Sequence, residues 1–148
     1  MWYLFWCVVA GAAEFDRPPV VQGAVVVGRV RVALEVVEEP VITALVVGQG
    51  ADRAVLAGAP YAPTRVSLSP SGAMAAFVSG YSGFSSVYVV PTDGSAAPRQ
   101  LTNVGVRHTK AGRPEGFVDP PAAPPVFEGE WLVWKDAVGG AHRVRWSK

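Results

Sequence analysis

Glycine and proline interrupt this chain so often that no stretch of it keeps a helical periodicity over several turns. The 148 residues include 16 glycines and 13 prolines, and both residue types destabilise a helix interior. The runs between them are short, apolar and rich in valine, as β-strands are. Half of the residues are apolar and 17% are charged, which is enough to build the core of one domain of this length. The sequence therefore predicts an all-β, antiparallel fold.

The clearest strand signal lies in Val20–Val37, where apolar and polar side chains alternate from Arg29 onward. One face of the predicted strand carries Arg29, Arg31, Ala33 and Glu35, and the other carries Val30, Val32, Leu34 and Val36. We expect the first face to be solvated and the second to be buried, as antiparallel sheets allow. Further strands are predicted at Val41–Val47, Arg53–Ala57, Thr64–Leu68, Glu130–Lys135 and Ala141–Trp146.

The last two predicted strands form a hairpin with Gly139 and Gly140 at its turn. Its side chains are expected to pair across the two strands, with Trp131, Val133 and Trp134 facing His142, Val144 and Trp146. Aromatic and β-branched pairs of this kind stabilise a sheet by roughly 0.2–1 kcal/mol each.

Residues Val66–Thr102 hold two more predicted strands, Ala73–Ser79 and Ser86–Pro91, with turn residues on both sides of each. Glycine supplies a positive φ in these turns, proline presets φ, and aspartate or serine side chains bond their own backbone. Five short elements follow one another in order: SPSG at 69–72, AFVS at 76–79, VYV at 87–89, DG at 93–94 and RQLT at 99–102.

This succession resembles one repeat of the TolB-like (WD40-like) β-propeller family, in which a blade reads roughly S-P-D-G, A-F-x-S, I/V-Y-V, D-G and R-Q-L-T. Ser71 stands where the family has aspartate. A blade has four strands in about 40–45 residues, so residues 14–148 would supply about three blades by length and about two by strand count. Closed propellers need at least about four blades. The resemblance thus implies a partial propeller of two to three blades that closes by self-association, or strands that pack as a sandwich-like open sheet.

The chain begins with the apolar run MWYLFWCVVAGAA, residues 1–13, which has about the length of a signal peptide. The small residues Ala10, Gly11 and Ala12 are typical of a cleavage site, although no basic side chain precedes the apolar run. The run is too short to span a bilayer as a helix. We expect export to the periplasm or the outside of the cell, with residues 14–148 as a single domain. The alternative is a buried strand or helix at the N-terminus.

Residues 103–125 are predicted to form a long extended loop, because they are rich in proline and glycine. Phe117 could lie against the sheet, so that the loop would cross the domain like a strap. Loops of this length inside a compact domain are typically functional or mobile.

No group of side chains has the spacing of a catalytic or metal-binding motif. His108 and His142 are the only histidines, and both are expected at the surface or in the hairpin. The sequence GYSGF around Ser82 lacks the second glycine of a nucleophile elbow, so Ser82, Ser85 and Ser86 are interpreted as turn residues. We therefore expect neither an enzyme nor a bound cofactor.

Charge argues against a nucleic-acid partner, since 13 basic and 12 acidic side chains are interspersed along the chain. Aromatic residues in loops are frequent anchors of protein partners. Tyr81 and Phe84, between two predicted strands, and Phe117 in the long loop are accordingly the candidate binding surface. The alternative for these three rings is packing over the sheet.

The function predicted from these observations is that of a non-enzymatic, exported β-propeller-like module that mediates protein–protein or cell-envelope interaction. One alternative is an accessory propeller-like piece of a hydrolase or peptidase, encoded separately or truncated. Another is a degenerate remnant without a selected function.

Overall fold

The computed structural model describes residues 20–38 and 42–147, so the predicted signal peptide at residues 1–13 lies outside the described residues. The described residues form eleven strands and two short 3-10 helices, Gly50–Asp52 and Ala59–Tyr61. The all-β prediction is therefore confirmed. Within the same ranges, no helix is both long enough and apolar enough to cross a membrane.

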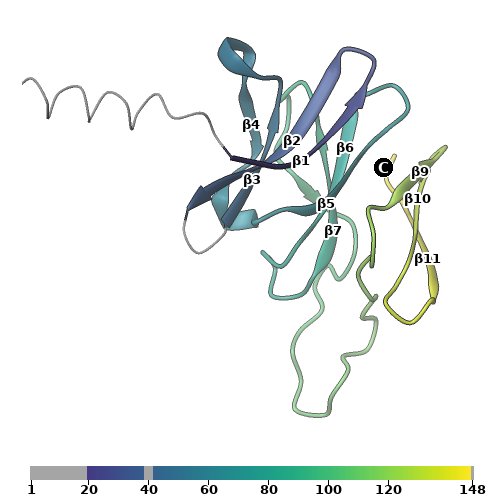
Figure 1. Ribbon diagram of the computed structural model, residues 1–148. Helices are drawn as coiled ribbons and strands as arrows, with labels where there is room; N and C mark the ends of the chain where they lie inside the picture. The colour runs from purple at the N-terminus through teal and green to yellow at the C-terminus, as the bar shows by residue number, and fades with distance from the viewer. Residues whose placement is uncertain (1–19, 39–41, 148) are drawn as a thin grey trace, which may run out of the picture.

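The strands form three antiparallel sheets, and each sheet uses strands that follow one another along the chain (Figure 1). The first sheet contains β1 (Val20–Val27), β2 (Val30–Glu38), β3 (Ile42–Val47) and β4 (Ala54–Ala57) in this order. The middle sheet contains β5 (Thr64–Leu68), β6 (Met74–Ser79), β7 (Ser86–Pro91) and β8 (Arg99–Gln100). The last sheet contains β9 (Val126–Glu128), β10 (Trp131–Lys135) and β11 (Ala141–Arg145), with β10 in the centre. None of these sheets closes on itself in the part of the chain that the structure describes.

The predicted run Val20–Val37 folds into a hairpin at Gly28 and Arg29, with Val27 paired to Val30. Gly28 has a φ of +58°, a conformation that glycine adopts at little cost and that tight hairpin turns require.

The middle sheet is buried on both faces because the other two sheets pack against it. The core that it shares with the first sheet contains Ala75, Phe77, Tyr88 and Val90. The core that it shares with the last sheet contains Ala76, Val87 and Val89. These two sets alternate along β6 and β7, so the period of two residues explains why both strands are apolar almost throughout.

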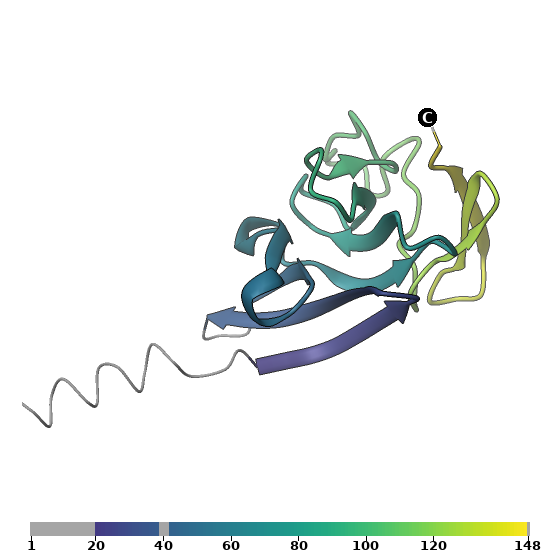
Figure 2. The same cartoon turned by 90° about the horizontal axis from the view of Figure 1, so that it is seen from above.

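The first strands of the three sheets lie next to one another. β5 contacts β1 on one side and β9 on the other (Figure 2). Because each sheet continues away from its first strand in chain order, the three sheets are stacked face to face with their first strands gathered together.

The expectation of a solvated face at Arg29, Arg31, Ala33 and Glu35 is wrong for the last two residues. Ala33 is 1% exposed and Glu35 is 3% exposed. The Nε atom of Arg53 lies 2.7 Å from Oε2 of Glu35, so an arginine from the segment before β4 covers the carboxylate. Ala33 is paired with Val46 on β3, which is also buried.

The predicted pairing in the C-terminal hairpin is correct for Trp134 and wrong for Trp131 and for Val133, which is opposite Arg143. Trp134 is opposite His142 and packs toward the middle sheet, whereas Trp131 is opposite Arg145 on the outer face. Because side chains alternate along β10, Leu132 lies on the opposite face from Trp131 and is buried in the core shared with the middle sheet.

Candidate functional site

Residues 103–125, which we call the strap, contain no named strand or helix, as the sequence predicts. The strap connects the middle sheet to the last sheet and extends below β7, beside the β10–β11 hairpin (Figure 1). The three candidate binding residues lie in two places. Phe84 and Phe117 are in contact, with ring centroids 5.3 Å apart, whereas Tyr81 stacks on Tyr61 instead.

The contact between Phe84 and Phe117 belongs to a larger group that we call the strap cluster. It consists of Phe84, His108, Arg113 and Phe117. The His108 ring is stacked on Phe84 at a centroid distance of 4.0 Å, and its Nε2 lies 3.1 Å from the carbonyl oxygen of Gly83, to which a protonated ring nitrogen donates. The Arg113 guanidinium lies over the Phe117 ring, 5.0 Å from its centroid. Both phenylalanines are half-buried, and the two polar members are exposed.

The second aromatic group joins Tyr81 to the core of the domain. Tyr81 is 59% exposed, and its ring stacks on Tyr61 with centroids 4.5 Å apart. Tyr61 in turn meets Phe77 and Tyr88 edge-on. Burial raises the pKa of the Tyr61 hydroxyl, and the neighbouring Tyr81 and Tyr88 raise it further. Tyr81 is thus an exposed ring on a rigid support.

Ser79 fixes the spacing of the two stacked tyrosines. Its hydroxyl donates to the Tyr61 carbonyl oxygen and accepts a hydrogen bond from the Tyr81 N–H, the latter at 3.1 Å. Ser79 is 2% exposed, so both bonds are shielded from water.

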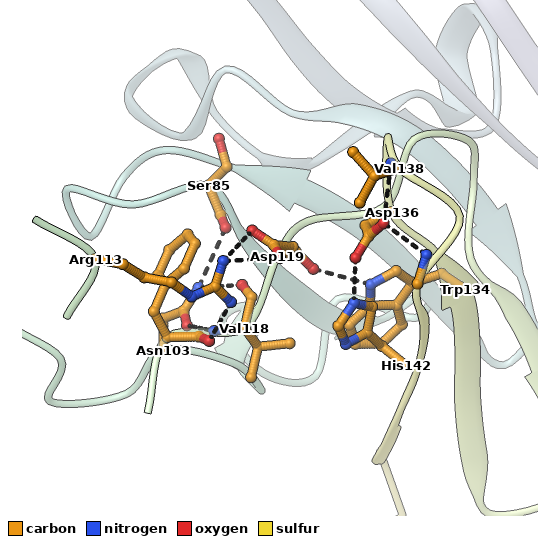
Figure 3. Close-up of polar contacts among 11 residues, drawn as sticks. Ser85, Asn103, Arg113, Val118, Asp119, Trp134, Asp136, Val138 and His142 are labelled. Carbon is orange, nitrogen blue, oxygen red and sulfur yellow. Dashed lines mark hydrogen bonds and ion pairs between the residues drawn. The ribbon is translucent and has the colours of Figure 1, made fainter. Parts of the chain in front are cut away.

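Asn103 anchors the beginning of the strap to its middle. Its Oδ1 accepts the Val118 N–H at 2.7 Å, and its Nδ2 donates to the Val118 carbonyl at 3.1 Å. The same amide nitrogen lies 3.3 Å from the Ser85 carbonyl oxygen (Figure 3) and 3.3 Å from Ser86 Oγ. Asn103 is 6% exposed and has a φ of +57°, a conformation that asparagine adopts more easily than most residues. One side chain therefore ties the strap both to itself and to the start of β7.

Asp119, the residue after Val118, anchors the same part of the strap to the last sheet. Trp134 Nε1 donates to the Asp119 carbonyl oxygen at 3.0 Å. The Asp119 carboxylate accepts two hydrogen bonds from Arg113 Nη1, at 3.0 and 2.9 Å, and Arg113 Nη2 donates to the Phe117 carbonyl at 2.9 Å (Figure 3). Arg113 therefore holds the chain around Phe117 in a closed turn.

Asp136 and His142 form a hydrogen-bonded pair in the β10–β11 hairpin. His142 Nε2 lies 2.7 Å from Asp136 Oδ2, and Asp136 Oδ1 accepts the N–H groups of Val138 and Gly140 at 3.0 and 2.8 Å. The hydrogen bond from His142 lowers the pKa of the Asp136 carboxyl most, and the two backbone donors lower it further. The pair closes the β10–β11 turn.

Asp119, Asp136 and His142 bring one potential metal-ligand atom each to within 4.8 Å of one another. Sequence reasoning did not identify this group, because its members are separated along the chain and match no spaced motif. Arg113 already compensates the charge of Asp119, and Asp136 Oδ1 already accepts two backbone hydrogen bonds. The strap and the hairpin are joined here by the bond from Trp134 Nε1 to the Asp119 carbonyl oxygen.

Ser82 lies in the loop between β6 and β7, and Ser86 is the first residue of β7. Their hydroxyls both donate to the Phe84 carbonyl oxygen, at 3.4 and 3.1 Å. The bond from Ser82 is typical of a turn residue, as the sequence predicts, whereas the interpretation of Ser86 as a turn residue is wrong, because Ser86 is a buried strand residue.

Comparisons with protein-family models, with curated proteins and with solved structures found no match to this chain.

Proposed function

We propose that the chain is a non-enzymatic binding module whose three sheets are successive blades of a partial β-propeller. Two observations support this arrangement. The strands of each sheet follow one another in chain order, and the first strands of neighbouring sheets are in contact. Stacking of this kind is the way in which propeller blades are repeated around an axis. The TolB-like pattern in residues 66–102 falls on β5–β8, the sheet that has a neighbour on both faces.

The binding surface that we propose has two parts, the exposed Tyr81 ring and the strap cluster, which are linked by the loop between β6 and β7 that carries both Tyr81 and Phe84. The observation that carries the proposal is the double anchoring of the strap. Asn103 holds one part of it to the middle sheet, and Trp134 holds another part to the last sheet. A loop that is ordered before binding loses less conformational entropy when a partner is bound.

The chemistry of this surface favours a protein partner. Tyrosine and arginine are enriched among residues that dominate protein–protein affinity, and such residues are supported by surrounding packed contacts. Tyr81 presents a large ring with few rotatable bonds, and Arg113 presents a guanidinium whose position is fixed by Asp119. With the apolar N-terminal run as a signal peptide, the partner would be met in the periplasm or outside the cell.

The test is a capture experiment with the purified 148-residue chain immobilised at its C-terminus and presented with cell-envelope extract or cytosolic extract. Partners bound by the native chain would be identified and their affinity measured. Tyr81→Ser and Phe117→Ser should each weaken binding of the same partner by about tenfold or more. Val104→Ser is the matched control, because Val104 is 67% exposed and belongs neither to the strap cluster nor to the tyrosine pair. Equal affinity for all four proteins would contradict the proposed surface.

A second candidate function is supported by the apolar outer faces of the first and last sheets, where Val26 and Val126 are 60% and 56% exposed. Faces of this kind would suit an accessory piece that packs onto a hydrolase or peptidase chain. If this function is correct, peptidase activity from the extract should bind to the immobilised native chain and to the Tyr81→Ser variant. It should not bind to the Val26→Lys variant.

A further inference from the structure

The strap carries more basic side chains than the strap cluster includes. Residues 107–113 read RHTKAGR, so arginine, histidine and lysine take four of the seven positions and no residue is acidic. We call residues 107–113 the basic tip. All four basic members are exposed: Arg107, His108, Lys110 and Arg113. The basic tip belongs to the loop that projects beyond the end of β7 (Figure 1).

The basic tip is held near both of its ends. His108 is stacked on the loop between β6 and β7, and Arg113 is bonded to the carboxylate that follows it in the strap. Between these two points, Thr109 and Gly112 form an isolated antiparallel bridge, and the Thr109 hydroxyl lies 3.5 Å from the Gly112 carbonyl oxygen. Lys110 is therefore presented by a tight turn between two fixed points.

Two cations of the basic tip have no counter-charge in the part of the chain that the structure describes. The Arg113 guanidinium pairs with Asp119 at 2.9 Å. Arg107 and Lys110 form no ion pair among the described residues. The other carboxylate of the strap, Glu115, is exposed and is likewise unpaired within those residues. The strap thus presents two unpaired cations and one unpaired carboxylate.

From this arrangement we propose that the strap binds an acidic segment of another protein. Arg107 and Lys110 pair with carboxylates of that segment, and an apolar side chain of the segment lies against the half-buried rings of Phe84 and Phe117. Opposite charges at the rim of an interface steer association and fix its register, while packed aromatic residues supply most of the affinity. This inference rests on the binding surface under Proposed function, and it names the chemistry of the partner.

The small number of cations favours a protein segment over other anionic partners. Strong nucleic-acid binding neutralises many phosphates, about six to ten, and anionic lipid surfaces are recognised by clusters of about four to eight lysines or arginines. The basic tip offers two unpaired cations, which suit two carboxylates of a peptide. The His108 ring also covers one face of Phe84, with the ring centroids 4.0 Å apart, so that face is not available for stacking on a nucleobase.

The experiment selects peptides from a random library displayed on phage, using the 148-residue chain immobilised at its C-terminus. The expected result is enrichment of peptides in which two or more aspartates or glutamates lie near an aromatic or aliphatic residue. A selected peptide is then synthesised with a fluorescent label and titrated with the chain. Because the ionic contacts are exposed, its affinity should fall as the salt concentration rises from about 0.05 M to about 0.5 M. Enrichment without acidic residues, or no enrichment, would overturn the inference.

Two double variants with the same change in charge locate the ionic contact. Arg107→Gln with Lys110→Gln should weaken binding of the peptide by about fivefold, and this variant should bind equally well a peptide whose acidic residues are replaced by their amides. The matched control is Arg29→Gln with Lys135→Gln, which removes one exposed arginine and one exposed lysine outside the strap and should leave the affinity within about twofold. Circular dichroism confirms that each variant is folded. Equal losses in the two double variants would overturn the inference.

The aromatic variants separate this inference from the proposed binding surface. Weaker binding by Phe117→Ser with no effect of the charge variant would keep the surface and overturn the acidic partner. Weaker binding by the charge variant with no effect of Phe117→Ser or Tyr81→Ser would overturn the aromatic surface and keep the acidic partner. Vesicles of phosphatidylglycerol and phosphatidylcholine and a single-stranded oligonucleotide serve as competitors. Displacement of the labelled peptide by either of them more readily than by unlabelled peptide would overturn the assignment to a protein segment.

Discussion

Asn103 exchanges two hydrogen bonds with the backbone of Val118, accepting its N–H at 2.7 Å and donating to its carbonyl at 3.1 Å. The two residues are 15 positions apart, and the intervening chain carries His108, Arg113 and Phe117 of the strap cluster. A loop has no neighbouring strand, so its backbone N–H and carbonyl groups need other hydrogen-bond partners. The Asn103 side chain supplies both partners for Val118. This pairing converts a long proline-rich segment into a defined surface.

Asn103→Ala should destabilise the protein by about 2 kcal/mol, because it leaves the half-buried N–H and carbonyl of Val118 without their side-chain partner. Urea unfolding of the two proteins measures the difference. Asn103→Asp is the informative second variant, since its carboxylate can still accept the Val118 N–H but cannot donate to the carbonyl. It should fall between the native protein and the alanine variant. If Asn103→Ala lowered the free energy of unfolding by less than about 0.5 kcal/mol, the Asn103 anchor would not be energetically important.

Gly72→Ala should be more destabilising than the same change at Gly94. Both glycines have positive φ values, +78° and +75°, but an added Cβ at Gly72 would lie 2.9 Å from Val30 Cγ2, whereas nothing lies within 4 Å at Gly94. Gly94→Ala should cost about 1 kcal/mol from backbone conformation alone. Gly72→Ala should cost about 1–3 kcal/mol more, through the clash with the first sheet. Thermal or urea unfolding compares the two, and equal losses would contradict the close approach of Gly72 to Val30.

Arg53→Leu should destabilise the protein by about 2 kcal/mol, because it leaves the Glu35 carboxylate buried without its counter-charge. The Arg53 side chain is 35% exposed and the Glu35 side chain 4% exposed, so solvent screening keeps the effect below that of a fully buried pair. The double variant Glu35→Leu with Arg53→Leu should regain most of the loss, since neither charge then remains. If the double variant were as unstable as the single one, the pair would be needed for a reason other than charge compensation.

Acid should weaken the β10–β11 turn through Asp136. The hydrogen bond from His142 holds the pKa of the Asp136 carboxyl below its ordinary value of 3.8 in the folded chain. A group of this kind contributes stability that is complete above its unfolded pKa and is lost as the pH falls through the folded value.

We therefore predict that the native protein loses stability as the pH falls below about 4, and that Asp136→Asn loses less over the same interval. Thermal unfolding of both proteins across a pH series makes the comparison. The variant should be the less stable protein at neutral pH, and the difference should narrow on acidification. Parallel curves would exclude Asp136 as a source of the acid dependence.

The sequence predicts most of the strands, because their signal is local. Alternation and turn residues locate β5 and β7 at their observed bounds, and β3, β4, β6, β10 and β11 to within one residue. The run Val20–Val37 was predicted without the turn that divides it into β1 and β2. β8 and β9 were not predicted, since strands of two and three residues are too short to show a period. Glu35 was assigned to a solvated face because the arginine that covers it comes from a different strand connection, 18 residues away.

The candidate site was predicted only in its aromatic members. Phe117 was expected to lie against the sheet, and its ring contacts Phe84 in the loop between β6 and β7, whereas Tyr81 stacks on Tyr61. The polar anchors, Asn103 and Asp119, act through backbone atoms far along the chain. Bonds of this kind have no periodicity and no preferred spacing, so only the folded chain reveals them.

The central claim is that the strap is a fixed surface, and the most direct measurement is amide hydrogen exchange of the free 148-residue chain. The Val118 N–H, bonded to Asn103 Oδ1, should exchange far more slowly than an unstructured amide, and it should lose that protection in Asn103→Ala while the amides of β6 and β7 keep theirs. Exchange of Val118 at the rate of an unstructured peptide in the native protein would contradict the claim.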